Sequence, residues 1–156
     1  MEENEVHIVR LLRKILRAVE IDSRKLSVQF NTTPAQLLAL RKLLCTKEQS
    51  LSKLADEVGL SPSTMVGVID RLEKKGLVVR NRSQKDRRLV NIIITDAGKS
   101  YLEESPSLLQ DKLSQALVSY SESDKANILR SLQLLTNILD AQKIDASPVL
   151  DTGGLV

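Results

Sequence analysis

The residues of this chain that are best suited to do chemistry are basic and lie close together. Residues 82–90, RSQKDRRLV, hold four basic side chains and one acidic one. Residues 61–90 carry eight basic and three acidic side chains, a net charge of +5, whereas the whole chain has +3. Such a concentration of positive charge is typical of a protein that binds a polyanion. A solvated charged surface without a ligand is the alternative, and charge by itself does not decide between them.

The chain offers little for catalysis. His7 is the only histidine and Cys45 the only cysteine, and no glycine-rich phosphate loop is present. No Ser–His or Cys–His pair and no cysteine-based zinc site is indicated. We therefore expect no enzyme activity, no catalytic residue, no cofactor and no metal site. Cys45 follows Leu43 and Leu44, and we expect it to be a small buried hydrophobe rather than a redox sensor.

Composition indicates the class of protein. The 156 residues suit one domain, or one domain with a dimerising extension. Only 2% of them are aromatic, so the core is expected to be aliphatic, and stacking of single-stranded bases is disfavoured. The charged N-terminus does not resemble a signal peptide, and no apolar run approaches the length of a membrane span. These features favour a reducing, cytoplasmic setting.

Recurring start signals predict four helices in the first half of the chain. An apolar stripe predicts a long helix over 5–29, and Thr33 with Pro34 begins a second helix that runs to about residue 44. Ser50 and Ser61 are expected to cap two short helices that meet at a tight turn after Gly59. Two short helices joined in this way are typical of a helix-turn-helix.

A basic hairpin follows the helix-turn-helix. Residues 77–83 and 88–95 favour strands, and QKDR joins them. A helix-turn-helix followed by such a hairpin is a winged helix, which makes the basic hairpin its wing. The fold class is therefore mainly α with a small β hairpin: a winged helix-turn-helix over 33–99, flanked by helical dimerisation regions at 1–32 and 100–143. A loose tail is expected at 144–156. In the second flank we expect a helix start, or a kink, at Ser105 and Pro106, a cap at Ser121 with Asp124, and a helix beyond it.

The helix after Ser61 is expected to enter the major groove of double-stranded DNA. Short uncharged residues at its start allow close approach to base edges, and the basic residues further along can reach phosphates. On the wing, Arg87 and Arg88 can reach a minor groove, while Asp86 can orient a neighbouring guanidinium. A role of Ser63 and Thr64 in capping alone is the alternative. The full predicted DNA-binding set is Ser61, Ser63, Thr64, Val66, Gly67, Arg71, Lys74, Arg82, Lys85, Asp86, Arg87 and Arg88.

Apolar stripes outside the winged helix predict a homodimer. A winged helix does not need these residues for its own core, and a second copy of the chain would bury them and place two reading helices about one DNA turn apart. Completion of a monomeric core by the outer helices is the alternative. The predicted dimerisation residues are Ile8, Leu12, Ile15, Val19, Leu108, Leu113, Leu117, Ile128, Leu132, Leu135 and Leu139.

The stretch LSKLADEVGLSPSTMVGVIDRLEKKGLVVRNRSQKDRRLVNIIITDAGK resembles the multiple antibiotic resistance regulator (MarR) family of bacterial winged-helix transcription factors. The resemblance runs from about residue 5 to 143, and DRR before a strand that ends in TDAG is its most specific mark. It implies a homodimer that binds a palindromic operator and usually represses. It also implies that a small anionic or phenolic effector releases the DNA, although no ligand-binding residues are predicted. Val66 and Gly67 depart from the family, which often has Ser or Thr and Arg there, so no operator sequence follows.

One other function fits the same residues. A winged helix can serve as a protein-interaction module, or as a DNA-binding module without sequence preference. Sequence preference and salt dependence separate these possibilities, because a non-specific binder shows the steep salt dependence alone.

Overall fold

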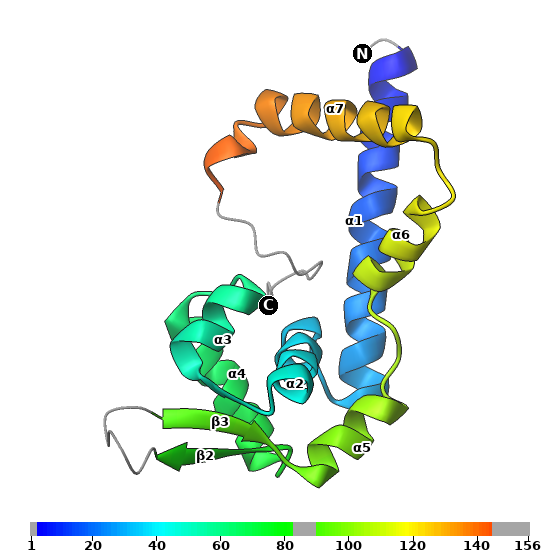
Figure 1. Cartoon of the computed structure of the whole chain (residues 1–156). Coiled ribbons are helices and arrows are strands. Elements are labelled where there is room, and N and C mark those ends of the chain that lie inside the picture. The colour runs from blue at the N-terminus through cyan, green and yellow to red at the C-terminus, as the bar shows by residue number, and fades with distance from the viewer. Residues whose placement is uncertain (1–2, 83–89, 145–156) are drawn as a thin grey trace. The chain divides into compact units, whose positions relative to one another are not determined.

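The computed structural model describes residues 3–82 and 90–144, which form two compact units (Figure 1). The first unit contains the N-terminal helix and the winged helix, and the second begins at Ser107. The expected dimerisation region, made of 1–32 and 100–143, remains a prediction. In the first unit the elements are α1 (Glu3–Phe30), α2 (Pro34–Thr46), β1 (Glu48–Ser50), α3 (Leu51–Val58), α4 (Pro62–Lys74), β2 (Val78–Arg82), β3 (Val90–Ile94) and α5 (Asp96–Glu104). In the second they are α6 (Leu109–Leu117), α7 (Glu122–Ile138) and the short 3-10 helix η1 (Ala141–Lys143).

Hydroxyl side chains begin most of these helices, as their sequence positions predict. The side-chain oxygens of Thr33, Ser50, Ser61, Thr95 and Ser121 each accept a hydrogen bond from a backbone N–H of the first helical turn. Each such bond satisfies one N–H group that has no partner within its helix. The predicted mainly α winged-helix fold is confirmed.

The sheet has three strands rather than the two of the predicted hairpin. Its order is β1–β3–β2, and both pairings are antiparallel. The sequence Glu48-Gln49-Ser50 has neither alternating hydrophobicity nor β-branched residues, so pattern alone does not reveal β1. It becomes a strand because it pairs with Asn91–Ile93 of β3, which is a long-range contact.

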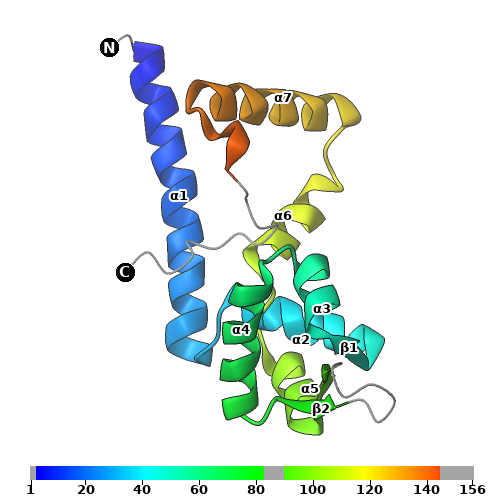
Figure 2. The ribbon, with the colours of Figure 1, turned by 90° about the vertical axis from the view of Figure 1, so that its left-hand side faces the viewer.

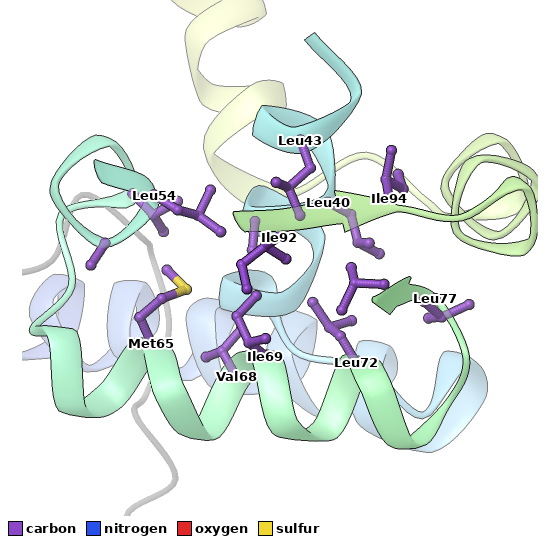
Figure 3. Packing of buried hydrophobic residues seen from close by; sticks show 14 residues of the cluster. Leu40, Leu43, Leu54, Met65, Val68, Ile69, Leu72, Leu77, Ile92 and Ile94 are labelled. Atoms are coloured by element: carbon purple, nitrogen blue, oxygen red, sulfur yellow. The ribbon is translucent and has the colours of Figure 1, made fainter. Parts of the chain in front are cut away.

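The core of the first unit is aliphatic, as the composition predicts. Helices α2, α3 and α4 pack against one another and against the sheet (Figure 3). Leu40 and Leu43 come from α2, Leu54 from α3, and Ile92 from the central strand β3. The predicted inner stripe of α4 is confirmed, since its four members Met65, Val68, Ile69 and Leu72 are all buried.

The base of the hairpin is closed by main-chain contacts. The carbonyl of Leu77 accepts from the N–H of Thr95 at 3.0 Å, and the hydroxyl of Thr95 donates to the carbonyl of Gly76 at 2.7 Å. Gly98 lies directly against Leu77, because a Cβ at Gly98 would clash with the Leu77 carbonyl and lie 2.8 Å from Cγ1 of Ile94. The TDAG segment therefore fixes the start of α5 to the end of the wing.

Helix α1 joins the winged helix only near its C-terminal end. Leu26 is its one buried residue, and the hydroxyl of Tyr101 on α5 donates to the carbonyl of Phe30 at 2.5 Å. Most of its other apolar side chains are exposed. None of the described helices is long and apolar enough to cross a membrane.

Two expectations were wrong. No helix starts or kinks at Ser105–Pro106: Ser105 instead ends α5, donating its hydroxyl to the Tyr101 carbonyl at 2.7 Å. Helix α6 begins at Leu109, and the carboxylate of Asp111 accepts from the N–H of Leu108 at 3.0 Å. Cys45 is exposed rather than buried. The helical period turns Leu40 and Leu43 inward, so the next two residues of α2, Leu44 and Cys45, face outward.

Candidate DNA-binding interface

The turn between α3 and α4 sets the direction of the helix predicted to read DNA. Gly59 ends α3 in the left-handed conformation, with φ of 70°. The next N–H, of Leu60, donates to the carbonyl of Ala55 at 2.9 Å, and Ala55 is completely buried. A small residue at this position lets the two helices approach closely, so α4 leaves the turn in a fixed direction (Figure 2).

Helix α4 has one buried face and one accessible face. The accessible face carries Ser63, Thr64, Val66, Arg71 and Lys74, all exposed. Gly67 lies among them with no atom within 4 Å of where a Cβ would stand. The N-terminal half of this face is therefore shallow and uncharged, and its C-terminal half is basic.

Three hydroxyl groups gather at the start of α4. The Ser61 oxygen lies 3.0 Å from the hydroxyl of Ser63 and 2.8 Å from that of Thr64, and it accepts from the Thr64 N–H at 3.2 Å. Ser63 and Thr64 thus support the cap while their side chains remain exposed. Capping and contact with a base edge are compatible at this position, because a hydroxyl group has both a donor and acceptor sites.

The acidic residues of α4 are held away from its basic ones. Arg80 on β2 binds Asp70 at 2.6 Å and Glu73 at 2.5 Å through its two terminal nitrogens. Its backbone N–H also donates to Glu73, at 3.3 Å. Burial lowers the pKa of Arg80, but the hydrogen bonds and charges of the two carboxylates outweigh it and raise that pKa. Arg80 thus ties the wing to α4 and neutralises the two carboxylates.

The wing is described only in part. Arg82 is exposed at the end of β2. Lys85, Asp86, Arg87 and Arg88 lie outside the described residues. Their role as the tip of the wing remains a prediction.

The predicted dimerisation residues differ in how far the single chain exposes them. Ile8, Ile15, Leu113, Ile128, Leu132 and Leu139 are exposed, and Leu12, Val19, Leu117 and Leu135 are partly buried. Leu108 differs, because only 1% of it is exposed in the single chain. Further exposed apolar residues accompany the predicted ones, among them Leu11 and Leu16 on α1 and Leu129 and Ile138 on α7.

Sequence reasoning missed two side chains near this interface, Arg80 and Lys75. The Lys75 ammonium group donates to the carbonyl of Asn31, and it donates to Oε1 of Gln36 at 3.0 Å. The signal for Arg80 was the pair of carboxylates three residues apart on α4, followed by an arginine on the adjoining strand. Lys75 gave no signal, because its partners are 39 and 44 residues away.

Comparison with known proteins agrees with this geometry. Residues 32–90, which span α2 to the start of β3, match the model of the MarR family. The uncharacterised HTH-type transcriptional regulator YsmB of Bacillus subtilis is 28% identical over 85% of this chain and 91% of its own. The HTH-type transcriptional repressor MdtR of the same species is 38% identical over 46% of each chain. A crystal structure of a MepR-like protein complexed with pseudoligands has a TM-score of 0.63 and 24% identity, over 88% of this chain and 97% of that one.

Helix α4 has a buried face and an accessible face that is shallow and basic, and the wing lies beside it. The sequence and structure matches agree with this arrangement. DNA-binding regulators of this kind are not enzymes, in agreement with the expectation from the sequence. The chain is similar to the MarR family of winged-helix, DNA-binding transcriptional regulators, whose model matches residues 32–90.

Proposed function

We propose that the protein is a sequence-specific repressor that acts in the cytoplasm as a homodimer on a pseudo-palindromic operator. The observation that carries the proposal is the exposed face of α4, on which Ser63, Thr64 and Gly67 precede Arg71 and Lys74. Short side chains at the start of the helix let the backbone approach base edges in the major groove. The two cations further along meet the phosphate backbone, and Arg82 with the wing meets the adjoining groove.

Exposed apolar residues support the homodimer. Ile15 on α1 is 57% exposed, and Leu132 on α7 is 50% exposed, each among several similar neighbours. Helix faces of this kind are stabilised when a second copy covers them. A two-fold axis would then place two copies of α4 one turn of DNA apart, and the operator would be an inverted repeat.

Repression and release by a small molecule are supported by relatives. MdtR is a repressor, and the MepR-like protein binds pseudoligands. For this chain we infer repression that an anionic or phenolic effector relieves, by favouring a dimer whose reading helices have the wrong spacing for DNA.

Selection of bound sequences from a random duplex DNA pool at about physiological salt tests the proposal. The expected result is an enriched inverted repeat with half-sites roughly 10 base pairs apart. A matched variant, Thr64→Val, keeps the shape of the side chain and removes its hydroxyl. It should change the enriched bases within each half-site while the half-site spacing stays the same.

Two other results would overturn the proposal. Retention of the pool without enrichment would indicate a winged helix that binds DNA without sequence preference. No retention at all, with the protein folded and dimeric, would indicate a module that binds another protein.

A further inference from the structure

A cavity of about 350 Å³ lies where the end of α1, the turn at residues 31–33, the first turn of α2 and the end of α4 meet. The described residues that line it include three cations, Arg71, Lys74 and Lys75, and no carboxylate. The rest of the lining is hydroxyl and amide groups, such as those of Ser27 and Gln36. The cavity is therefore positively charged and rich in hydrogen-bond donors.

Among the described residues, no ion pair joins an acid to these cations. Asp70 and Glu73 are the acidic residues of α4, and both are bound to Arg80. Lys75 donates instead to two neutral oxygens, the Asn31 carbonyl and Oε1 of Gln36. Burial lowers the pKa of Lys75, and the positive charge of Arg71 lowers it further.

Gln36 supplies an oriented donor to the same cavity. Only 3% of this residue is exposed, and its Oε1 accepts from Lys75 at 3.0 Å and from the Thr32 hydroxyl at 3.3 Å. The bond from Lys75 fixes which end of the amide is oxygen, because an ammonium group can only donate. Its Nε2 has no acceptor among the described residues. An acceptor in the cavity would satisfy it.

We propose that this cavity binds an oxyanion, a phosphate or a carboxylate group, between Arg71, Lys74, Lys75 and the amide nitrogen of Gln36. Arg71 and Lys74 also belong to the accessible face of α4 that is proposed to contact DNA. Their second role rests on that proposed function, but the binding of an anion to the free protein does not. The anion has two possible sources: a phosphate of the DNA backbone, or a free small molecule that competes with DNA for the same cations.

The variant Gln36→Glu tests the site without removing the packing around it. A glutamate keeps acceptor oxygens for Lys75 and Thr32, replaces the amide donor, and lowers the positive charge of the cavity by one unit. Inorganic phosphate is the probe, titrated into the full-length protein at constant ionic strength and followed by NMR through the side-chain amide of Gln36 and the backbone amides of 31–36. Lys42→Gln is the matched control, because Lys42 is an exposed lysine of α2 that does not line the cavity.

Phosphate should shift these amide signals saturably in the wild-type protein and in Lys42→Gln. In Gln36→Glu, followed through the backbone amides, its affinity should fall at least about tenfold, since the variant loses a hydrogen bond to a charged group and adds a like charge. Absence of a saturable shift in the wild-type protein, or equal binding by Gln36→Glu, would overturn the proposal. This arm contains no DNA, so its result is independent of the proposed repressor function.

A second arm identifies the source of the anion through the DNA affinity of the two proteins in phosphate-free buffer. If a DNA phosphate occupies the cavity, Gln36→Glu should bind DNA more weakly, with a salt dependence reduced by about one phosphate contact. If a free anion occupies it, added phosphate should inhibit DNA binding by the wild type and leave DNA binding by Gln36→Glu unchanged from its own value in phosphate-free buffer. A variant that binds DNA normally and is inhibited as strongly as the wild type would contradict both.

Discussion

Acidic and basic residues of α4 are sorted on different sides of the helix. Asp70 and Glu73 meet Arg80 of β2, whereas Arg71 and Lys74 are exposed. An acid left beside Arg71 would repel DNA phosphates and weaken the attraction of the neighbouring cation. The net positive charge at this end of α4 thus depends on Arg80, which lies outside the predicted DNA-binding set.

Arg71→Ala should weaken binding to the selected operator and to random DNA by similar factors. A phosphate contact carries no sequence information, so the preference for the operator should change little. The slope of log affinity against log salt concentration should fall by about 0.9, the value for one phosphate. Fluorescence anisotropy at several salt concentrations measures both effects, with Lys42→Ala as the control. A loss confined to the operator would show instead that Arg71 reads a base.

Gly67 and Gly98 illustrate how differently two glycines can be constrained. A Cβ at Gly67 would meet open space, whereas one at Gly98 would meet the Leu77 carbonyl and the Ile94 side chain. Gly67 therefore leaves the accessible face of α4 open, whereas Gly98 lets the start of α5 pack closely against Leu77 and Ile94.

Gly98→Ala should destabilise the fold by about 1–3 kcal/mol, the usual cost of overpacking. Gly67→Ala should stabilise it by about 0.5–1 kcal/mol, because alanine restricts the unfolded chain and favours a helix. Chemical denaturation of both variants measures the difference. Equal stability of the two would mean that the hairpin base shifts easily to admit a methyl group.

Local sequence predicts elements well where their determinants are local. The caps at Ser50, Ser61 and Thr95 were predicted because a hydroxyl and the N–H it accepts from lie three residues apart. Strand β1 was not, because its partner in β3 lies more than 40 residues further along the chain. The error at Ser105 has a similar origin: a hydroxyl can begin one helix or end another, and its bond to the Tyr101 carbonyl decided this.

The candidate site follows the same division. The exposed and buried faces of α4 were predicted from helical periodicity, which is local. The ion pairs of Arg80 and the hydrogen bonds of Lys75 depend on how separate elements pack, and periodicity carries no information about them.

Arg80→Met should destabilise the winged helix by about 1 kcal/mol. The Arg80 side chain is 28% exposed and its partners more so, which keeps each ion pair weak. In a protein that already carries Asp70→Asn and Glu73→Gln, the same substitution should lower the free energy of unfolding only slightly, because no carboxylate is then left without its partner. Urea denaturation of the four proteins completes this cycle. Equal costs in both backgrounds would mean that Arg80 acts through packing alone.

At the scale of the whole molecule, helices α1 and α7 carry many apolar side chains that remain exposed in the single chain. Exposed leucine, isoleucine and valine side chains concentrate on α1 and α7, outside the winged helix. The winged-helix core is closed around its own buried residues. The winged helix thus has a complete core of its own, whereas the apolar surface of α1 and α7 is what a second copy of the chain would cover in the proposed homodimer.

Ile15→Glu should shift the protein from dimer to monomer, because it places a charge in the proposed apolar interface. Leu44→Glu is the control, since Leu44 is a similarly exposed apolar residue of α2. Sedimentation velocity over a range of protein concentrations measures the change. A wild-type protein that remains monomeric at all of them would contradict the homodimer.

The closed base of the hairpin also bears on how this chain can diverge. Its contacts use the carbonyls of Gly76 and Leu77 and the backbone N–H of Thr95, which are main-chain groups. The joint also depends on a hydroxyl at residue 95, on the lack of a side chain at residue 98, and on the left-handed conformation of Gly76, with φ of 71°. Substitutions at exposed strand positions, such as Val79 and Arg82, can therefore change what the wing contacts without disturbing the base of the hairpin.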